Sequence, residues 1–121
     1  MASIMIADSY KSKMEEYRKN GSDDEWFFVK LTDHFGQCEP FNAFEAIDSI
    51  VNYTLIEDEA DLFYDHIQFL IYLGRKANTV ESPQALKNAV AVLVEKATKF
   101  GDPQLSSVRA LCAWFRLPFN K

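Results

Sequence analysis

Glycine and proline divide this chain into segments whose hydrophobic residues recur with a helical period. Three glycines each follow such a segment and three prolines each open one: Gly21, Gly36, Gly101, Pro40, Pro83 and Pro103. Glycine just past a helix and proline in its first turn are typical helix boundaries. The only β-branched run, residues 89–94, keeps a period of about 3.6 residues and is not read as a strand. The sequence therefore predicts an all-α fold.

About six helices are expected, joined by short loops. They cover residues 3–20, 22–35, 40–55, 57–77, 82–100 and 102–118. The fourth is apolar over the widest arc, so we expect it at the centre. The chain of 121 residues corresponds to one domain, residues 1–121. A compact helical bundle and a short stack of helical hairpins both fit, and no internal repeat decides between them.

The charge is divided unevenly along the chain. Residues 20–68 hold twelve acidic side chains and a single basic one, Lys30. The remaining sequence holds twelve basic and six acidic residues. The chain is thus acidic in its middle part and mildly basic toward both ends. Acids in the first turn of a helix complement the helix dipole, and the basic ends are expected to pair with part of the acidic middle.

Three acids of the fourth segment are spaced to form a carboxylate ridge. Glu57, Asp61 and Asp65 recur every four residues with no base between them, so they repel one another. We consider two interpretations: a recognition surface for a basic partner, or an acidic face neutralised by the basic ends. The predicted partner-binding residues are Asp58, Asp61, Asp65, Glu45, Asp48 and Glu57, with Trp26 and Tyr64 as aromatic anchors.

Consecutive aromatic residues in the second segment support an interface. Trp26, Phe27 and Phe28 point in different directions around a helix, so they cannot all face one core. Either one of them lies at the surface beside the acids, as in protein interfaces, or this helix is buried on two sides. The sequence leaves both possibilities open.

The chain lacks the motifs that carry common chemistry. Its four glycines are scattered, and there is no P-loop, dinucleotide fingerprint, GxSxG or HExxH motif. The two histidines, His34 and His66, each follow an aspartate, but adjacent residues on a helix diverge by about 100° and do not chelate together. We expect them to be surface or partly buried residues. No enzyme activity, cofactor or metal is predicted.

Two further observations concern the compartment. Cys38 and Cys112 lie far apart without metal-ligand spacing, which is typical of a reducing environment, although their pairing stays open. The N-terminus lacks the basic and apolar regions of a signal peptide. The apolar run at residues 67–74 is far shorter than a membrane span of about 20 residues. A cytoplasmic protein without a membrane partner is expected.

Nucleic-acid binding is a less favoured alternative. The last two predicted helices are joined by a short turn, as in a helix-turn-helix, and would offer Gln104, Ser106, Ser107 and Arg109 to a groove. The protein as a whole is acidic, with an isoelectric point near 5.0, and this negative charge opposes binding to phosphates.

Overall the chain resembles the small acidic bacterial immunity proteins that neutralise a cognate toxin. The resemblance is carried by residues 23–28 (DDEWFF) and 57–65 (EDEADLFYD), without a diagnostic motif. It implies a non-catalytic, one-to-one complex with a toxin domain, often a basic nuclease, whose active site the acids occlude. The alternative from a different class is a small regulatory or adaptor subunit of a larger complex, which would bind through an apolar face.

Overall fold

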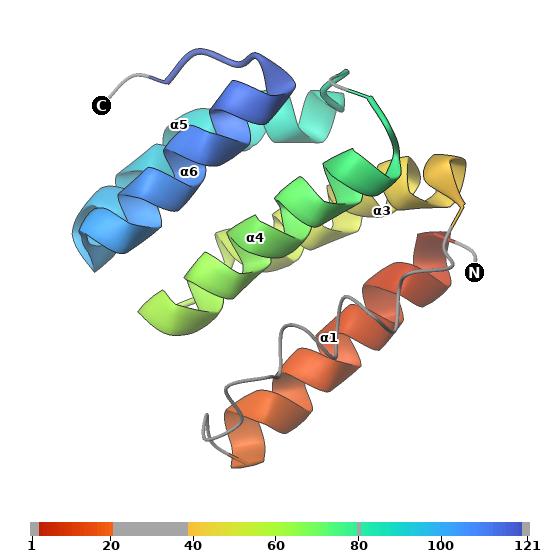
Figure 1. The fold of residues 1–121 in the computed structure, drawn as a ribbon. Helices are drawn as coiled ribbons and strands as arrows, with labels where there is room; N and C mark the ends of the chain where they lie inside the picture. The colour runs from red at the N-terminus through yellow and green to blue at the C-terminus, as the bar shows by residue number, and fades with distance from the viewer. Residues whose placement is uncertain (1–2, 21–38, 80, 120–121) are drawn as a thin grey trace.

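The computed structural model describes residues 3–20, 39–79 and 81–119. In these ranges it contains five α-helices and no strand (Figure 1): α1 (Ser3–Asn20), α3 (Pro40–Leu55), α4 (Ala60–Lys76), α5 (Gln84–Phe100) and α6 (Asp102–Phe115). The all-α prediction is confirmed. The helix predicted over residues 22–35 lies outside the described residues, and with it Trp26, His34 and Cys38.

Local sequence explains most helix ends. Pro40 and Pro103 lie in the first turns of α3 and α6, where the missing backbone N–H costs nothing. Gly101, between α5 and α6, has a φ of 139°, which side chains disfavour. Asn78, beyond the end of α4, adopts the left-handed conformation with a φ of 54°. Most ends agree with the predicted ones within two residues. The largest differences are three residues: α4 begins at Ala60 rather than at Glu57, and α6 ends at Phe115 rather than at residue 118.

The helices form two stacked antiparallel pairs with α1 along one side (Figure 1). In the first pair α3 packs on α4, and in the second α5 packs on α6. The second pair lies on the first with α6 beside α4 and α5 beside α3, while α1 packs on α3. α4 and α6 run in the same direction (Figure 1), and Gln104 at the start of α6 donates a hydrogen bond to the carbonyl oxygen of Ala60 at the start of α4.

This arrangement brings several helix ends together. α1 runs in the same direction as α3, so the C-terminal ends of both lie at the same end of the bundle as the N-terminal ends of α4 and α6 (Figure 1). The carboxylate-rich turn at residues 56–59 joins α3 to α4 at this end. Side chains far apart in the sequence therefore meet there.

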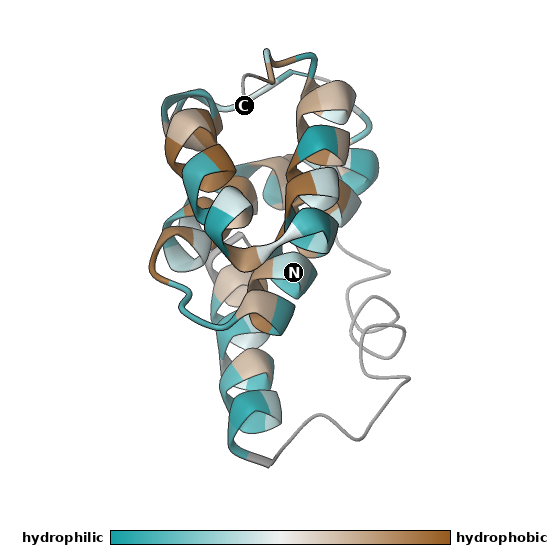
Figure 2. Cartoon of the chain, turned by 90° about the vertical axis from the view of Figure 1, so that its left-hand side faces the viewer, coloured by the Kyte–Doolittle hydropathy of each residue, from teal (hydrophilic) through white to brown (hydrophobic). Residues whose placement is uncertain are grey.

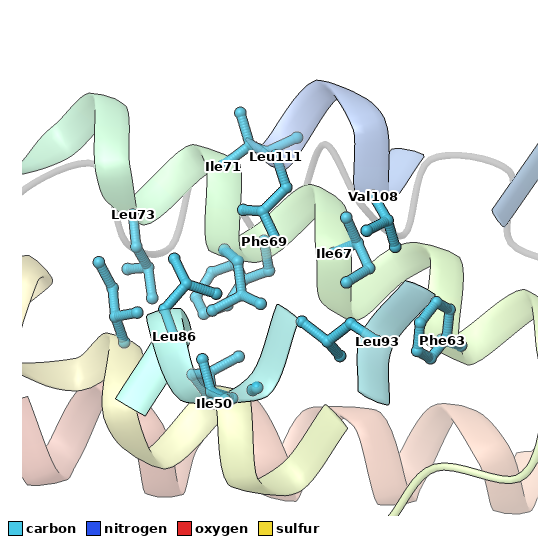
Figure 3. Packing of buried hydrophobic residues seen from close by; sticks show 14 of the residues in the cluster. Ile50, Phe63, Ile67, Phe69, Ile71, Leu73, Leu86, Leu93, Val108 and Leu111 are labelled. Carbon is cyan, nitrogen blue, oxygen red and sulfur yellow. The ribbon is translucent and has the colours of Figure 1, made fainter. Parts of the chain in front are cut away.

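The core lies between the two pairs and is centred on α4, as expected. Figure 3 shows Leu86 and Leu93 of α5 directed toward Ile50 of α3 and the apolar residues of α4. Burial of each such side chain stabilises the fold by roughly 1.5–3 kcal/mol. In Figure 2 the helices carry both hydrophobic and hydrophilic residues. No described helix has the length and hydropathy to cross a bilayer.

Gly74 allows α4 and α6 to approach closely at the opposite end. A Cβ atom added there would lie 2.7 Å from Phe115 Cζ and 2.7 Å from Trp114 Nε1. Phe115 is buried and Trp114 donates a hydrogen bond to the Thr79 carbonyl oxygen, so a side chain at position 74 would have to displace both rings from these contacts.

Candidate functional site

The structure separates the acids of the predicted ridge into two groups. Asp61 and Asp65 lie one turn apart on α4, with Asp61 exposed and Asp65 half-buried. Glu57 precedes α4, and its side chain turns inward and is 3% exposed. The prediction that Glu57 belongs to a surface ridge is wrong, because the helix that would have aligned it begins three residues later, at Ala60.

Asp61 and Asp65 line a cavity between three helices, which we call the α4 pocket. Its volume is about 470 Å³, and it is lined by Tyr17 of α1, Asp61, Tyr64 and Asp65 of α4, and Pro103 and Gln104 of α6. Tyr64, a predicted anchor, is 38% exposed at this pocket. The structure therefore brings together three of the predicted binding residues: Asp61, Asp65 and Tyr64.

The carboxylates of the α4 pocket have no cationic partner in the part of the chain that the structure describes. Within the described ranges, no basic side chain lies within ion-pair distance of Asp61 or Asp65. Burial, and then the negative charge of Asp61, raise the pKa of Asp65 from 3.8 to about 6. The pocket thus holds two adjacent acidic side chains with no counter-ion among the described residues, and an acid with a perturbed pKa in a cleft is a candidate for a functional site.

Glu57 belongs instead to a buried hydrogen-bonded chain, the Arg18 network (Arg18, Glu57, His66 and Tyr10). Arg18 of α1 donates two hydrogen bonds to the Glu57 carboxylate, at 2.6 and 2.9 Å. Glu57 Oε1 also lies 2.7 Å from His66 Nε2, and His66 Nδ1 lies 2.7 Å from the Tyr10 hydroxyl. This chain links α1, the turn after α3, and α4.

The network has one consistent set of protons. Burial opposes ionisation of Glu57, but its hydrogen bonds with Arg18, a backbone N–H and His66 outweigh this and lower its pKa to about 2. The ionised carboxylate can only accept, so His66 donates through Nε2, and its Nδ1 accepts from the Tyr10 hydroxyl. Burial, only partly offset by Glu57, lowers the pKa of His66 and keeps it neutral.

This network resembles an acid–base relay in composition, and its Arg18 and Glu57 line a cavity of about 210 Å³. His66 and Tyr10 are both fully buried. The expectation of a surface or partly buried histidine at position 66 is therefore wrong. The network does hold the local structure, because Glu57 Oε2 also accepts from the backbone N–H groups of Asp58 and Glu59. Its carboxylate thus caps the turn that leads into α4.

The same arginine confirms that a basic end pairs with the acidic middle. Besides Glu57, Arg18 contacts the carboxylate of Glu59 at 3.1 Å and that of Glu15 at 3.4 Å. Asp58 stays exposed and also lines the smaller cavity beside Arg18. Arg18 therefore pairs with the acids of the turn at residues 56–59 and not with the acids of the α4 pocket.

The remaining predicted contact residues lie elsewhere. Glu45 and Asp48 are exposed on α3, roughly 15 and 10 Å along the helix axis from its end at Leu55, at a rise of about 1.5 Å per residue. Neither lines the α4 pocket. Their role in binding stays a prediction, and Trp26 is outside the described residues.

The groove-reading residues proposed for α6 are partly wrong. Gln104 and Ser107 are buried, at 6% and 3% exposure. Gln104 donates to the Ala60 carbonyl oxygen at 3.1 Å, and Ser107 donates to the Gln104 carbonyl oxygen at 2.7 Å. Two of the four side chains are therefore committed to holding α6 in place and face the interior.

The sequence analysis did not identify Arg18 and Tyr10 as parts of a site, and it assigned Gln104 to a nucleic-acid groove rather than to the α4 pocket. One signal was available: His66 is flanked by hydrophobic residues at three and four positions on both sides, which places it on the apolar face of α4. A polar side chain on such a face needs hydrogen-bond partners. Their identity depends on residues up to 56 positions away in the sequence.

Neither metal chemistry nor relatives add to this description. Within residues 3–20, 39–79 and 81–119, no three histidine, cysteine, aspartate or glutamate side chains are placed to hold a metal ion. No family model matches the chain, and no curated protein or solved structure matches it either.

Proposed function

We propose that this protein is a non-catalytic binding module that receives a basic protein partner at the α4 pocket. The observation that carries the proposal is the pair Asp61 and Asp65, which lines a cavity and has no counter-ion within the described ranges. Tyr64 beside them supplies an aromatic anchor of the kind that dominates binding energy in interfaces.

The contrast between the two groups of acids supports this proposal. Glu57 and Glu59 pair with Arg18, so their charges are accounted for by folding. Folding offers no such reason for Asp65, whose charge is disfavoured by burial and by Asp61. A basic partner would relieve this repulsion, and opposite charge would accelerate the encounter.

The particular class we favour is an immunity protein acting on a cognate toxin domain, with a nuclease as a fitting target. The mechanism is occlusion: Asp58, Asp61 and Asp65 occupy the positions that substrate phosphates take in the toxin's active site. The complex is expected to contain one copy of each protein and to require no cofactor.

Affinity purification at two salt concentrations tests this proposal. Tagged protein from the native cell should recover one basic partner near a one-to-one ratio, with an association rate that falls as salt rises. Reversing Asp61 and Asp65 to lysine should abolish recovery. A control with Asp8 and Glu81 reversed changes the net charge equally but lies outside the α4 pocket, and it should bind normally.

The same experiment addresses the alternative of an adaptor subunit. Recovery of several subunits that resist high salt and tolerate both double variants would contradict the immunity proposal. Exposed Phe41 and Ile56 would then be the first apolar contacts to examine. They lie at opposite ends of α3, and isolated apolar residues of this kind are ordinary on protein surfaces.

A further inference from the structure

We infer that this protein pairs with a second copy of itself through the outward face of α4 and α6, with the two α4 helices antiparallel. The inference goes beyond the proposed function and does not depend on it. It is drawn from a second cavity on this face and from the spacing of opposite charges along α4.

The second cavity, which we call the α4–α6 groove, lies beyond the α4 pocket along the same two helices. Its volume is about 400 Å³, and it is lined by Gln68, Ile71 and Arg75 of α4 and by Ala110, Ala113 and Trp114 of α6. Four of these six side chains are apolar. The α4 pocket lies at the N-terminal ends of α4 and α6, and the groove lies toward their C-terminal ends. The face thus has an acidic cavity at one end and an apolar groove with an arginine at the other.

Opposite charges lie at the two ends of one line along α4. Asp61, Gln68 and Arg75 are seven residues apart, and seven residues are only about 20° short of two full helical turns. Asp61 and Arg75 are both exposed. They lie roughly 21 Å apart along the helix, at a rise of about 1.5 Å per residue, so they cannot pair within one copy.

Neither charge has an ion-pair partner in the part of the chain that the structure describes. The Arg75 guanidinium lies over the ring of Trp114, at 5.8 Å from its centroid, and so stands beside the groove. The charges of the face are therefore available to a complementary surface.

A second copy supplies both missing charges at once. When two α4 helices meet antiparallel with Gln68 opposite Gln68, position 61 of each copy faces position 75 of the other, because 68 is midway between them. Asp61 then pairs with Arg75 twice, as in any two-fold symmetric interface. The same arrangement places the α4 pocket of one copy over the α4–α6 groove of the other. A parallel arrangement would instead set like charges against each other.

The expected interface is small. The line from Asp61 to Arg75 is roughly 21 Å long, and two adjacent helices of about 10 Å diameter cover roughly 400 Å² before the relief of the side chains is counted. A stable complex buries about 800 Å² on each partner. The dimer should therefore be reversible, with a Kd on the order of 100 µM. A basic partner that binds the α4 pocket more tightly would displace the second copy.

Sedimentation velocity of the full chain at low salt and pH 7.5 tests the inference. Between about 5 and about 500 µM, the average mass should rise from that of one copy, 13.9 kDa, toward twice that value. High salt should shift this rise to higher concentration, because the interface contains two exposed ion pairs.

Charge reversal identifies the contact. Asp61→Arg and Arg75→Asp should each weaken self-association at least tenfold, because each turns two attractive pairs into two repulsive ones. A mixture of the two variants should restore it, since every reversed charge then faces a complementary one. Asp8→Arg and Lys87→Asp are matched controls at exposed positions that line neither cavity, and they should associate like the wild type. Circular dichroism of each variant checks that it is folded.

A cross-link tests the register. Facing helices have axes about 8–10 Å apart, and their Cα atoms lie about 2.3 Å from the axis, so the two Cα atoms at position 68 should be about 4–6 Å apart. This is within the range that a disulfide spans. Mild oxidation of Gln68→Cys should therefore give a covalent dimer, whereas Lys87→Cys and the wild type should not.

Four results would overturn the inference: the mass of one copy at every concentration, association that survives both single reversals, a mixture that stays monomeric, or controls that weaken association equally. The proposed function is judged separately by recovery of a basic partner. If recovery depends on Asp61 and Asp65 while the purified chain stays monomeric, the proposed function stands and self-association is rejected. If the dimer forms and no basic partner is recovered, only the proposed function fails.

Discussion

Replacing Asp65 with asparagine should stabilise the isolated protein at pH 8 and weaken its binding. Asparagine keeps the size of the side chain and removes only its charge. Burial and Asp61 raise the pKa of Asp65 from 3.8 to about 6, which shows that the ionised form is disfavoured in the folded state. Removing the carboxylate therefore removes an unfavourable charge from the native protein.

The magnitude follows from linkage. A folded pKa about 2 above the unfolded value corresponds to at most about 3 kcal/mol above pH 6, at 1.36 kcal/mol per pH unit. Because Asp65 is only half-buried, water screens part of this, and we expect Asp65→Asn to gain about 1–2 kcal/mol. For a domain of this size the melting temperature should rise by about 4 °C per kcal/mol.

The pH dependence of stability tests directly whether the charge of Asp65 destabilises the fold. A raised folded pKa contributes stability that is complete below the unfolded value of 3.8 and is lost as pH rises through about 6. Urea denaturation of both proteins should therefore show a gain for Asp65→Asn at pH 8 that disappears by pH 4. A variant that is less stable than the wild type at pH 8 would refute the reasoning, because Asp65 would then hold the fold together.

Three further predictions concern folding. Glu57→Gln should lower the free energy of unfolding by about 3 kcal/mol at pH 7, because it leaves Arg18 without its buried counter-ion. Denaturation at several pH values should show that the wild type, but not the variant, loses this stability as pH falls from 4.5 toward 2. Tyr10→Phe should cost about 1–3 kcal/mol by leaving His66 Nδ1 without a donor, and an unchanged denaturation midpoint would contradict that bond. Gly74→Ala should destabilise the protein by up to about 2 kcal/mol in thermal melts, because overpacking costs about 1–3 kcal/mol and the higher helix propensity of alanine offsets about 1 kcal/mol of this. A rise in melting temperature would show that the rings can move.

The helices were predictable from the sequence because their ends are determined locally. Pro40, Asn78 and Gly101 act through their own backbone conformation, which does not depend on the rest of the fold. The central position of α4 was predictable for a similar reason, since a helix with so wide an apolar arc has to be covered on several sides.

The inward turn of Glu57 was not predictable in the same way. Local spacing placed it on a ridge with Asp61 and Asp65, but its position is determined by Arg18, 39 residues earlier. Charge counts along the chain indicate that bases and acids pair; they do not indicate which acid receives the base. That choice depends on the parallel course of α1 and α3, which brings the ends of both helices to one place (Figure 1).

Glu57, before the start of α4, and Asp65, in its second turn, differ in whether the described structure stabilises their charge. Glu57 is the more buried of the two, yet its pKa is lowered to about 2, because Arg18, His66 and backbone N–H groups all stabilise its charge. Asp65 is less buried, yet its pKa is raised to about 6, because no described group compensates it. Burial alone would order the two pKa values the other way, so the presence of a partner decides. An acid that destabilises the isolated fold is a candidate for a functional role, because function can cost stability, and for Asp65 we propose a basic group of a partner as the counter-ion.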